Sequence, residues 1–241
     1  MTEYKRNEIY NRDCLAGLSD MPDNFVDVSF TSPPYNDKGG NNCKIGAHNT
    51  HQKYTVLESH KDDWLEWQIS IIDELLRVSK RWVIYNVQGL RSNRENVYKL
   101  IGHYANIIHD ILIWTKTNSQ PSGTPNVLNN NYEFILLLKC EGVNRVICNS
   151  DMLWNSFILP QNRNTFSGFH GAVMSQPLSD MIIREFTNEG DLVLDPFFGL
   201  GKTAISCIKM KRDYIGFEIC KEYVDMAKYR ISDETSHRRL F

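Results

Sequence analysis

The sequence has no long apolar run and no pattern that pairs its cysteines. No uninterrupted apolar stretch approaches the roughly 18 residues of a membrane-spanning helix, and Met1–Glu8 carry charges with no apolar segment behind them. We therefore expect no membrane association and a cytoplasmic protein. The six cysteines are scattered, without a CxxC pair or a Cys/His spacing typical of metal ligands. This argues against a zinc site, any other bound metal and a disulfide framework.

Charge of one sign is not in excess either. Lysine and arginine number 27 against 29 aspartates and glutamates, for a formal net charge of −2. The chain as a whole thus lacks the basic excess of many nucleic-acid-binding proteins, although a local basic face is compatible with this balance. Candidates for such a face cluster in a short span: Arg77, Lys80, Arg81, Arg91, Arg94 and Lys99. The same residues fit equally well on the solvated surface of a helix.

What the sequence does contain is an alternation of strand and helix patterns. Short apolar runs typical of buried strands lie at 26–30, 82–85, 108–114, 134–138, 191–194 and 214–217. Helical spacing of apolar residues covers 64–78 and 178–186. This alternation predicts an α/β protein with a parallel or mixed sheet and helices on both faces.

Two polar segments interrupt the alternation. Residues 36–63 are rich in asparagine, glycine, histidine and lysine and predict a long loop, which in a compact domain is usually functional. Residues 141–169 are polar with isolated aromatics, which favours a small insert. We expect one domain over 1–241, with a first half over 1–140, this insert, and a second half over 170–241.

The first chemical motif is Thr31-Ser-Pro-Pro-Tyr35, directly after the predicted strand 26–30. Ligands of α/β sheets bind beyond the carboxyl ends of the strands. Two prolines hold the backbone extended, so its carbonyl groups stay available as acceptors, and Ser32 adds a side-chain acceptor. Tyr35 offers a flat face on which an extruded base can stack. A plain proline turn next to an aromatic residue fits these residues equally well.

The second motif is Leu194-Asp-Pro-Phe-Phe-Gly-Leu-Gly-Lys-Thr203, a strand followed by a glycine turn and a helix. Gly199 and Gly201 allow a ligand to approach the backbone closely, and Asp195 at the strand end can receive a cationic or amino group. The next predicted strand leads to Glu218, at a place where an acidic residue typically holds ribose hydroxyls. Together these features predict a nucleoside-type cofactor.

Gly201-Lys-Thr203 also matches the end of a phosphate-binding loop. The complete loop, GxxxxGK[ST], needs a glycine five residues before Gly201, and that position is Pro196. The spacing therefore disfavours an ATPase.

The two motifs together resemble those of the amino-group DNA methyltransferases. The catalytic loop near residue 32 precedes the cofactor loop near residue 198, which resembles the β-class order. Asn11–Cys14 with Met21–Asp27 resembles the segment leading into the catalytic loop, and Trp114–Lys116 with Glu133 resembles the later strands of the catalytic half. The resemblance covers most of the chain.

This resemblance implies a Rossmann-like S-adenosylmethionine-dependent methyltransferase fold with a mixed, mostly parallel sheet. It implies direct methyl transfer from S-adenosylmethionine to an exocyclic amino group of a flipped base in double-stranded DNA. The catalytic residues are then Ser32, Pro33, Pro34 and Tyr35. The cofactor-binding residues are Asp13, Cys14, Thr31, His170, Asp195, Pro196, Phe197, Phe198, Gly199, Gly201, Lys202, Thr203 and Glu218. The resemblance also admits a homodimer, since β-class relatives often pair, and a cognate restriction endonuclease.

Two places depart from the family pattern. Lys202 stands where threonine is usual, and the segment from His170 to Pro177 lacks the first proline of the usual His-Pro-x-x-x-Pro. Within the family, serine at position 32 is the usual mark of cytosine-N4 enzymes, so we expect methylation of cytosine N4. Adenine N6 is the alternative, because the hydrogen-bonding groups of serine do not exclude it. A nucleic-acid-binding protein with a degenerate fold, or methylation of RNA or protein, are further alternatives.

Overall fold

The computed structural model describes residues 3–34, 63–90, 93–117, 119, 126, 128–145, 148–151, 153–161 and 174–238. Among these residues, no helix combines the length and the apolar character needed to cross a membrane. The predicted loop 36–63 lies outside the described residues except for Asp63.

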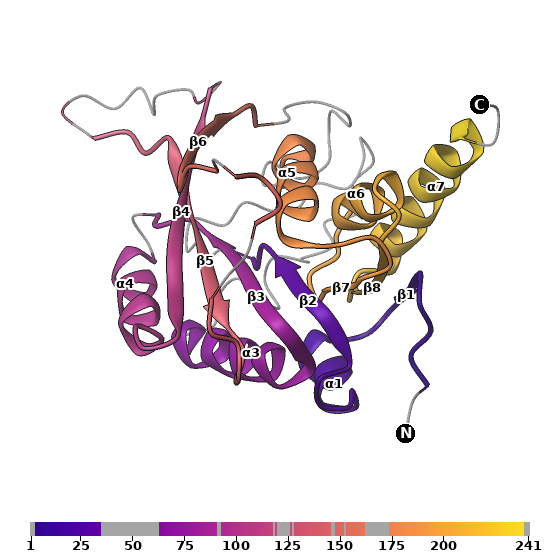
Figure 1. The fold of residues 1–241 in the computed structure, drawn as a ribbon, viewed down its shortest axis with the longest axis horizontal. Helices are drawn as coiled ribbons and strands as arrows, with labels where there is room; N and C mark the ends of the chain where they lie inside the picture. Colours follow the sequence, from indigo (N-terminus) through magenta and orange to yellow (C-terminus); the bar gives the residue numbers. More distant parts are fainter. Residues whose placement is uncertain are drawn as a thin grey trace, which may run out of the picture.

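An eight-stranded sheet forms the centre of the molecule, in the order β1-β8-β7-β2-β3-β5-β4-β6 (Figure 1). Its strands are β1 (Glu8–Tyr10), β2 (Val26–Thr31), β3 (Ser79–Val87), β4 (Ile108–Lys116), β5 (Tyr132–Lys139), β6 (Ser156–Leu159), β7 (Leu192–Asp195) and β8 (Asp213–Phe217). Only β5 runs antiparallel to its neighbours among these pairings, so the sheet is mixed and mostly parallel, as predicted.

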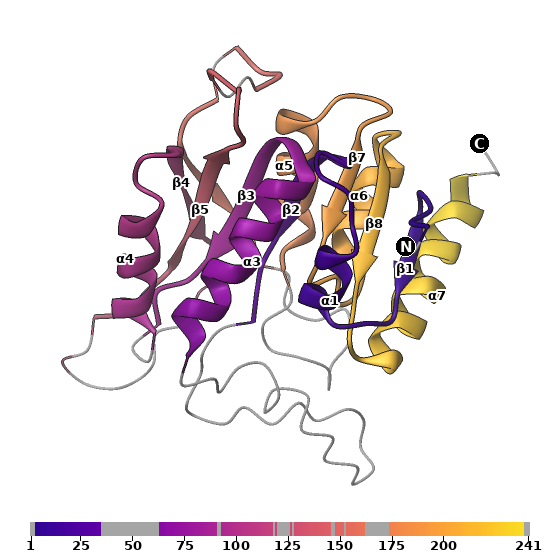
Figure 2. The same ribbon diagram turned by 90° about the horizontal axis from the view of Figure 1, so that it is seen from below.

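Helices cover both faces of the sheet, which confirms the predicted Rossmann-like architecture (Figure 2). One face carries α1 (Cys14–Ser19), α3 (Trp64–Val78) and α4 (Arg94–His103), and the other carries α5 (Gln176–Phe186), α6 (Lys202–Lys209) and α7 (Lys221–Arg238). The reason is visible in α3, whose apolar stripe buries Trp64, Ile71, Ile72 and Leu75 against the sheet.

All six predicted strands and both predicted helices are present, most of them longer than the apolar runs that indicated them. The sequence analysis does not predict the short strands β1 and β6, which have three and four residues. β6 lies inside the segment 141–169, where it pairs with β4 in parallel through Ser156 to Leu159. This part of the expected insert therefore extends the main sheet.

Most of the basic residues considered above have acidic partners. Four of the six candidates form ion pairs: Arg77 with Asp23 and Glu74, Lys80 with Asp27, Arg81 with Asp191, and Lys99 with Glu95. Lys80 and Arg81 begin β3, while Lys99 belongs to α4. The cluster in the sequence is thus divided between elements and largely neutralised, and Arg91 lies outside the described residues.

Candidate active site

The two predicted motifs meet at the carboxyl ends of two neighbouring central strands. β2 and β7 are parallel neighbours, with Ser29 opposite Leu194, so their carboxyl ends lie side by side. Residues 31–34 leave the sheet from β2 at this edge, and residues 195–201 leave it from β7. This edge is where open α/β sheets bind their ligands.

Asp195 links the two loops through its buried carboxylate. Oδ1 accepts hydrogen bonds from Thr31 Oγ1 at 2.7 Å and from the backbone N–H of Phe197 at 3.1 Å, and Oδ2 accepts one from Thr203 Oγ1 at 2.6 Å. Only 1% of the residue is exposed. Burial raises the pKa of Asp195 to about 6, although the hydrogen bonds act to lower it. The carboxylate of Asp195 thus accepts three hydrogen bonds from within the chain, and its direct contact with a ligand stays a prediction.

The glycine turn after β7 has the backbone shape that its sequence indicated. Gly199 and Gly201 have φ values of 51° and 73°, in the left-handed region that favours glycine. Among the described residues, a Cβ atom on Gly199 would meet the Phe197 carbonyl oxygen alone, at 3.9 Å, so this part of the structure leaves room for a ligand to approach the backbone. The turn ends where Gly201 precedes the first residue of α6, Lys202.

Lys202 is buried, although threonine is usual at this position in the family. Burial and, to a smaller extent, the nearby positive charge of Arg230 together lower its pKa to about 8. Its carbonyl oxygen accepts a hydrogen bond from Gln176 Nε2 at 3.2 Å, which ties the start of α5 to the start of α6.

Glu218, which directly follows β8, is hydrogen-bonded to the glycine turn after β7. Its Oε2 accepts a hydrogen bond from the Gly199 N–H at 2.8 Å, and its Oε1 accepts one from the Cys220 N–H, also at 2.8 Å. The carboxylate thus lies directly after β8, beside the turn after β7. An acidic group at a strand end next to an open glycine turn fits a ribose-bearing cofactor such as S-adenosylmethionine.

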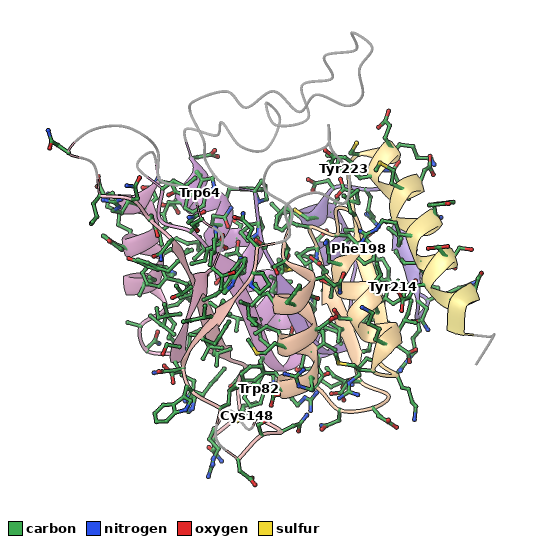
Figure 3. The ribbon with its side chains drawn as sticks, turned by 90° about the horizontal axis from the view of Figure 1, so that it is seen from above. Trp64, Trp82, Cys148, Phe198, Tyr214 and Tyr223 are labelled. Atoms are coloured by element: carbon green, nitrogen blue, oxygen red, sulfur yellow. The ribbon has the colours of Figure 1, made fainter. Side chains whose placement is uncertain are left out.

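Two consecutive phenylalanines point to opposite faces of the sheet. Phe198 is 3% exposed and packs with Tyr214, with ring centroids 5.8 Å apart (Figure 3). Phe197 is only half-buried and meets Trp67 of α3 edge-on, with centroids 5.7 Å apart. Phe198 is therefore part of the core. Phe197 lies on the face of the sheet that α3 covers. Cofactor contacts by either ring stay predictions.

The described part of the predicted catalytic loop is held by residues that the sequence analysis does not single out. Asn86 Nδ2 donates a hydrogen bond to Ser32 Oγ at 3.2 Å. Trp64 of α3, which is fully buried, donates from Nε1 to the Pro34 carbonyl oxygen at 3.4 Å. Pro33, which lies between Ser32 and Pro34 in the sequence, is buried. Hydrogen bonding by Asn86 and Trp64 cannot be read from spacing, because it depends on how β3 and α3 pack beside the loop.

The remaining predicted site residues fall into two groups. Asp13 accepts a hydrogen bond from the Ala16 N–H at 3.0 Å, which caps α1, and Cys14 is buried in the core. Pro196 is buried between Asp195 and Phe197. Tyr35 and His170 lie outside the described residues. In the part of the chain that the structure describes, no three His, Cys, Asp or Glu side chains gather as a metal site would require.

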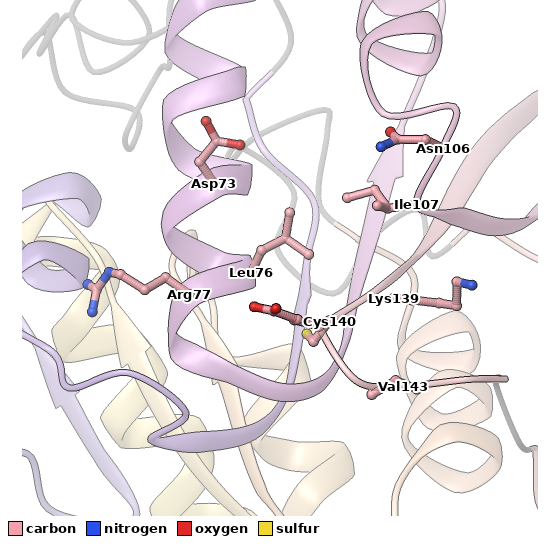
Figure 4. A pocket seen from close by; sticks show the side chains of 9 residues that line it. Asp73, Leu76, Arg77, Asn106, Ile107, Lys139, Cys140 and Val143 are labelled. Atoms are coloured by element: carbon pink, nitrogen blue, oxygen red, sulfur yellow. The ribbon is translucent and has the colours of Figure 1, made fainter.

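A hollow of about 590 Å³ elsewhere on the surface does not belong to this site (Figure 4). It is lined by the second half of α3, around Asp73 and Arg77, by Lys139 at the end of β5 and by Cys140 directly after it. Since β5 is antiparallel to β3, with Lys139 opposite Trp82, this hollow lies at the end of the sheet opposite to Ser32.

Comparison with known proteins gives a consistent result. The sequence profile of the N6/N4 DNA methylase family matches residues 26–229. Type II methyltransferase M.BglII of Bacillus subtilis is 26% identical over 281 aligned residues, which cover 98% of this chain and 71% of that protein.

Solved structures have the same fold. The PvuII DNA methyltransferase, described as cytosine-N4-specific, matches with a TM-score of 0.71 at 16% identity, over 94% of this chain and 86% of that one. A crystal structure of an M1.HpyAVI–SAM complex matches with a TM-score of 0.66 at 23% identity, over 93% and 98% of the two chains.

Proposed function

This chain belongs to the DNA methylase family, and from that membership we propose that it transfers a methyl group from S-adenosylmethionine to N4 of cytosine in DNA. The observation that carries the proposal is the Thr31–Asp195 hydrogen bond of 2.7 Å, which holds the Ser-Pro-Pro loop beside the glycine turn. A base on the first loop and a methyl donor on the second would then be neighbours, which is the requirement for direct transfer.

The cofactor is assigned to the glycine turn and the residues around it. Glu218 lies where it can hold ribose hydroxyls, and the open backbone at Gly199 allows close approach. When bound, S-adenosylmethionine supplies an electrophilic methyl group on a sulfonium. The roles of Asp13, Phe197 and His170 in holding its adenine and methionine ends follow from the family resemblance.

The chain's own part in the transfer is to hold and orient the target amino group. An exocyclic amine is a weak nucleophile because its lone pair is delocalised into the ring. Hydrogen bonds from its N–H groups to Ser32 Oγ and the Pro33 carbonyl oxygen would favour the pyramidal, reactive form. Tyr35 would stack on the flipped base and offset part of the cost of unpairing it. No cysteine nucleophile is used, since the attacking atom is the amine nitrogen.

The cytosine assignment depends on residue 32. A serine hydroxyl is neutral, whereas aspartate is the alternative at this position in the family, and within the family serine is the usual mark of the cytosine-N4 enzymes. Double-stranded DNA is the proposed substrate. A homodimer and a cognate restriction endonuclease are proposed as partners by the family resemblance alone.

Nucleoside mass spectrometry tests the proposal directly. DNA amplified in vitro, and hence unmethylated, is incubated with S-adenosylmethionine and either the wild type, Ser32→Ala or Tyr35→Ala. We expect N4-methylcytosine from the wild type and at least about 100-fold less from each variant, in line with the loss of a transition-state hydrogen bond or stacking partner. Tyr229→Ala, which removes a 73% exposed tyrosine of α7, is the matched control and should leave the yield unchanged.

Two other results would contradict the proposal in part or as a whole. N6-methyladenine would retain DNA methylation and overturn the choice of base. Absence of any methylated nucleoside, with varied DNA sequences offered, would overturn the proposed reaction.

A thermal-shift measurement separates the enzyme from a binding protein that has lost its cofactor site. A ligand that binds only the folded state raises the melting temperature in proportion to the logarithm of its concentration over Kd. We expect S-adenosylmethionine to raise it in the wild type and less in Glu218→Ala. An unchanged melting temperature in the wild type would favour the degenerate fold.

A further inference from the structure

A chain of buried polar side chains runs from the interior of the sheet to Ser32. Lys116 Nζ lies 2.5 Å from Glu133 Oε1, with side chains only 6% and 5% exposed. Asn86 Nδ2 donates to Glu133 Oε2 at 2.6 Å and to Ser32 Oγ at 3.2 Å. The four residues come from β4, β5, β3 and the end of β2, which are consecutive strands of the sheet.

The chemistry of the chain fixes the orientation of the Asn86 amide. A carboxylate can only accept hydrogen bonds, so the atom facing Glu133 must be the amide nitrogen. The same nitrogen faces Ser32, so Ser32 Oγ must accept from it. The serine hydroxyl proton is thereby directed away from Asn86, and the position of Oγ is set by a donor from the neighbouring strand.

The ion pair explains why this orientation is maintained. Lys116 compensates the buried charge of Glu133, and it also contacts Gln88 Oε1 at 3.4 Å and lies 5.3 Å from the centre of the Trp114 ring. A buried ion pair contributes little net stability compared with apolar side chains of the same size. Its presence next to the catalytic loop therefore calls for a role other than stability.

Asn86 itself bears a cost for this arrangement. Its Oδ1 is buried and has no hydrogen-bond partner among the described residues. An unpaired buried carbonyl is unfavourable. The amide is thus placed for what its nitrogen donates, and the two acceptors of that nitrogen are Glu133 and Ser32.

We propose that Lys116, Glu133 and Asn86 are positioning residues that fix Ser32 Oγ as the acceptor for the target amino group. This inference rests on the proposed function. It assigns the three residues an effect on the rate of methyl transfer through Ser32, and no direct contact with the base or the cofactor.

A double-mutant cycle between Asn86→Ala and Ser32→Ala tests the proposal, with single-turnover rates measured by nucleoside mass spectrometry. We expect Asn86→Ala to lower the rate by about tenfold or more, as misplacement of a reacting group does, with the Kd values for DNA and S-adenosylmethionine unchanged. In the Ser32→Ala background, Asn86→Ala should have no further effect, because the residue through which it acts is absent. Where Asn86→Ala does not fold, Glu133→Gln takes its place in the same cycle.

Ser79→Ala is the matched control. Ser79 Oγ and Ser29 Oγ form a buried hydrogen bond of 2.7 Å between the same two strands, β2 and β3, away from Ser32. This variant should lose stability and keep the wild-type rate. Rate effects that multiply in the double mutant, or a wild-type rate in Asn86→Ala, would show that the chain is only structural. A wild type that methylates no DNA would overturn the proposed function and this inference together.

Discussion

Thr31 and Asp195 are hydrogen-bonded to each other at 2.7 Å although 164 residues separate them in the sequence. Thr31 is the last residue of β2 and Asp195 the last of β7. The bond therefore sets the separation between the catalytic loop that follows one strand and the glycine turn that follows the other. Because both partners are buried, water cannot replace either of them when the bond is lost.

Replacing Thr31 by valine tests this link, because the shape is kept and the hydroxyl is removed. Thr31→Val should lower the free energy of unfolding at pH 8 by about 1–3 kcal/mol, as expected for a lost bond to a buried charged group. Urea unfolding followed by circular dichroism measures this. Thr31→Ser keeps the hydroxyl and should retain most of the stability, so equal losses in the two variants would contradict the assigned role of the hydrogen bond.

Asp195 predicts a dependence of stability on pH. Its folded pKa of about 6 is above its ordinary value of 3.8, so the folded state keeps a proton that the unfolded chain has lost between these values. The stability from this group is present below about pH 4 and lost as the pH rises through 6. Asp195→Asn should therefore gain stability relative to the wild type between pH 4 and pH 7.5, by about 3 kcal/mol. Chemical unfolding of both proteins across this range measures the difference, and a constant difference would contradict the prediction.

A side chain at Gly216 should clash with the ring of Phe198, which belongs to the glycine turn. A Cβ atom at Gly216 would lie 2.0 Å from Phe198 Cδ2, so Gly216→Ala must displace the ring and should cost about 1–3 kcal/mol. Gly102→Ala is the control, because a Cβ there meets nothing within 4 Å and the residue lies in α4. The control should be neutral or slightly stabilising. Thermal unfolding distinguishes them, and Phe198→Leu should recover part of the loss in Gly216→Ala.

Removal of the Trp64 indole N–H should affect the methylation rate, because this group donates a hydrogen bond to the Pro34 carbonyl oxygen. Trp64→Phe should lower the methylation rate about two- to tenfold, the equivalent of one hydrogen bond, and leave the Kd for S-adenosylmethionine unchanged. Trp82→Phe is the control, since Trp82 Nε1 has no hydrogen-bond partner within the described ranges and Figure 3 shows Trp82 far from Trp64. Equal rates in the two variants would contradict a positioning role for Trp64.

The sheet and the loop positions could be predicted because the signals are local. The strand Val26–Thr31 is almost entirely buried, and the helix Trp64–Val78 buries one apolar stripe, so the apolar spacing of each is strong. The Ser32 and Asp195 loops could be placed at one edge because parallel strands bring their carboxyl ends together.

Two sets of hydrogen bonds could not be predicted: those that Asp195 accepts from other residues of the chain, and the one that Asn86 donates to Ser32. Both depend on contacts between elements that are distant in the sequence. Asp195 reads as a ligand-binding carboxylate until Thr31 and Thr203 are placed around it. Asn86 directly follows the apolar run Trp82–Tyr85 of β3, and its partners Glu133 and Ser32 lie on neighbouring elements. Strand β6 was missed because two of its four residues are exposed and the run is short.

The position of β2 between β7 and β3 also determines when the active site can form during synthesis. A ribosome that has made the first 140 residues has supplied β2, β3, β4 and β5, but the β7 edge of β2 is still unpaired. The nascent chain exposes this edge until residues 192–195 emerge, and open edges favour pairing with other chains. The two predicted site loops can therefore come together only after residues 192–195 have been added to the sheet.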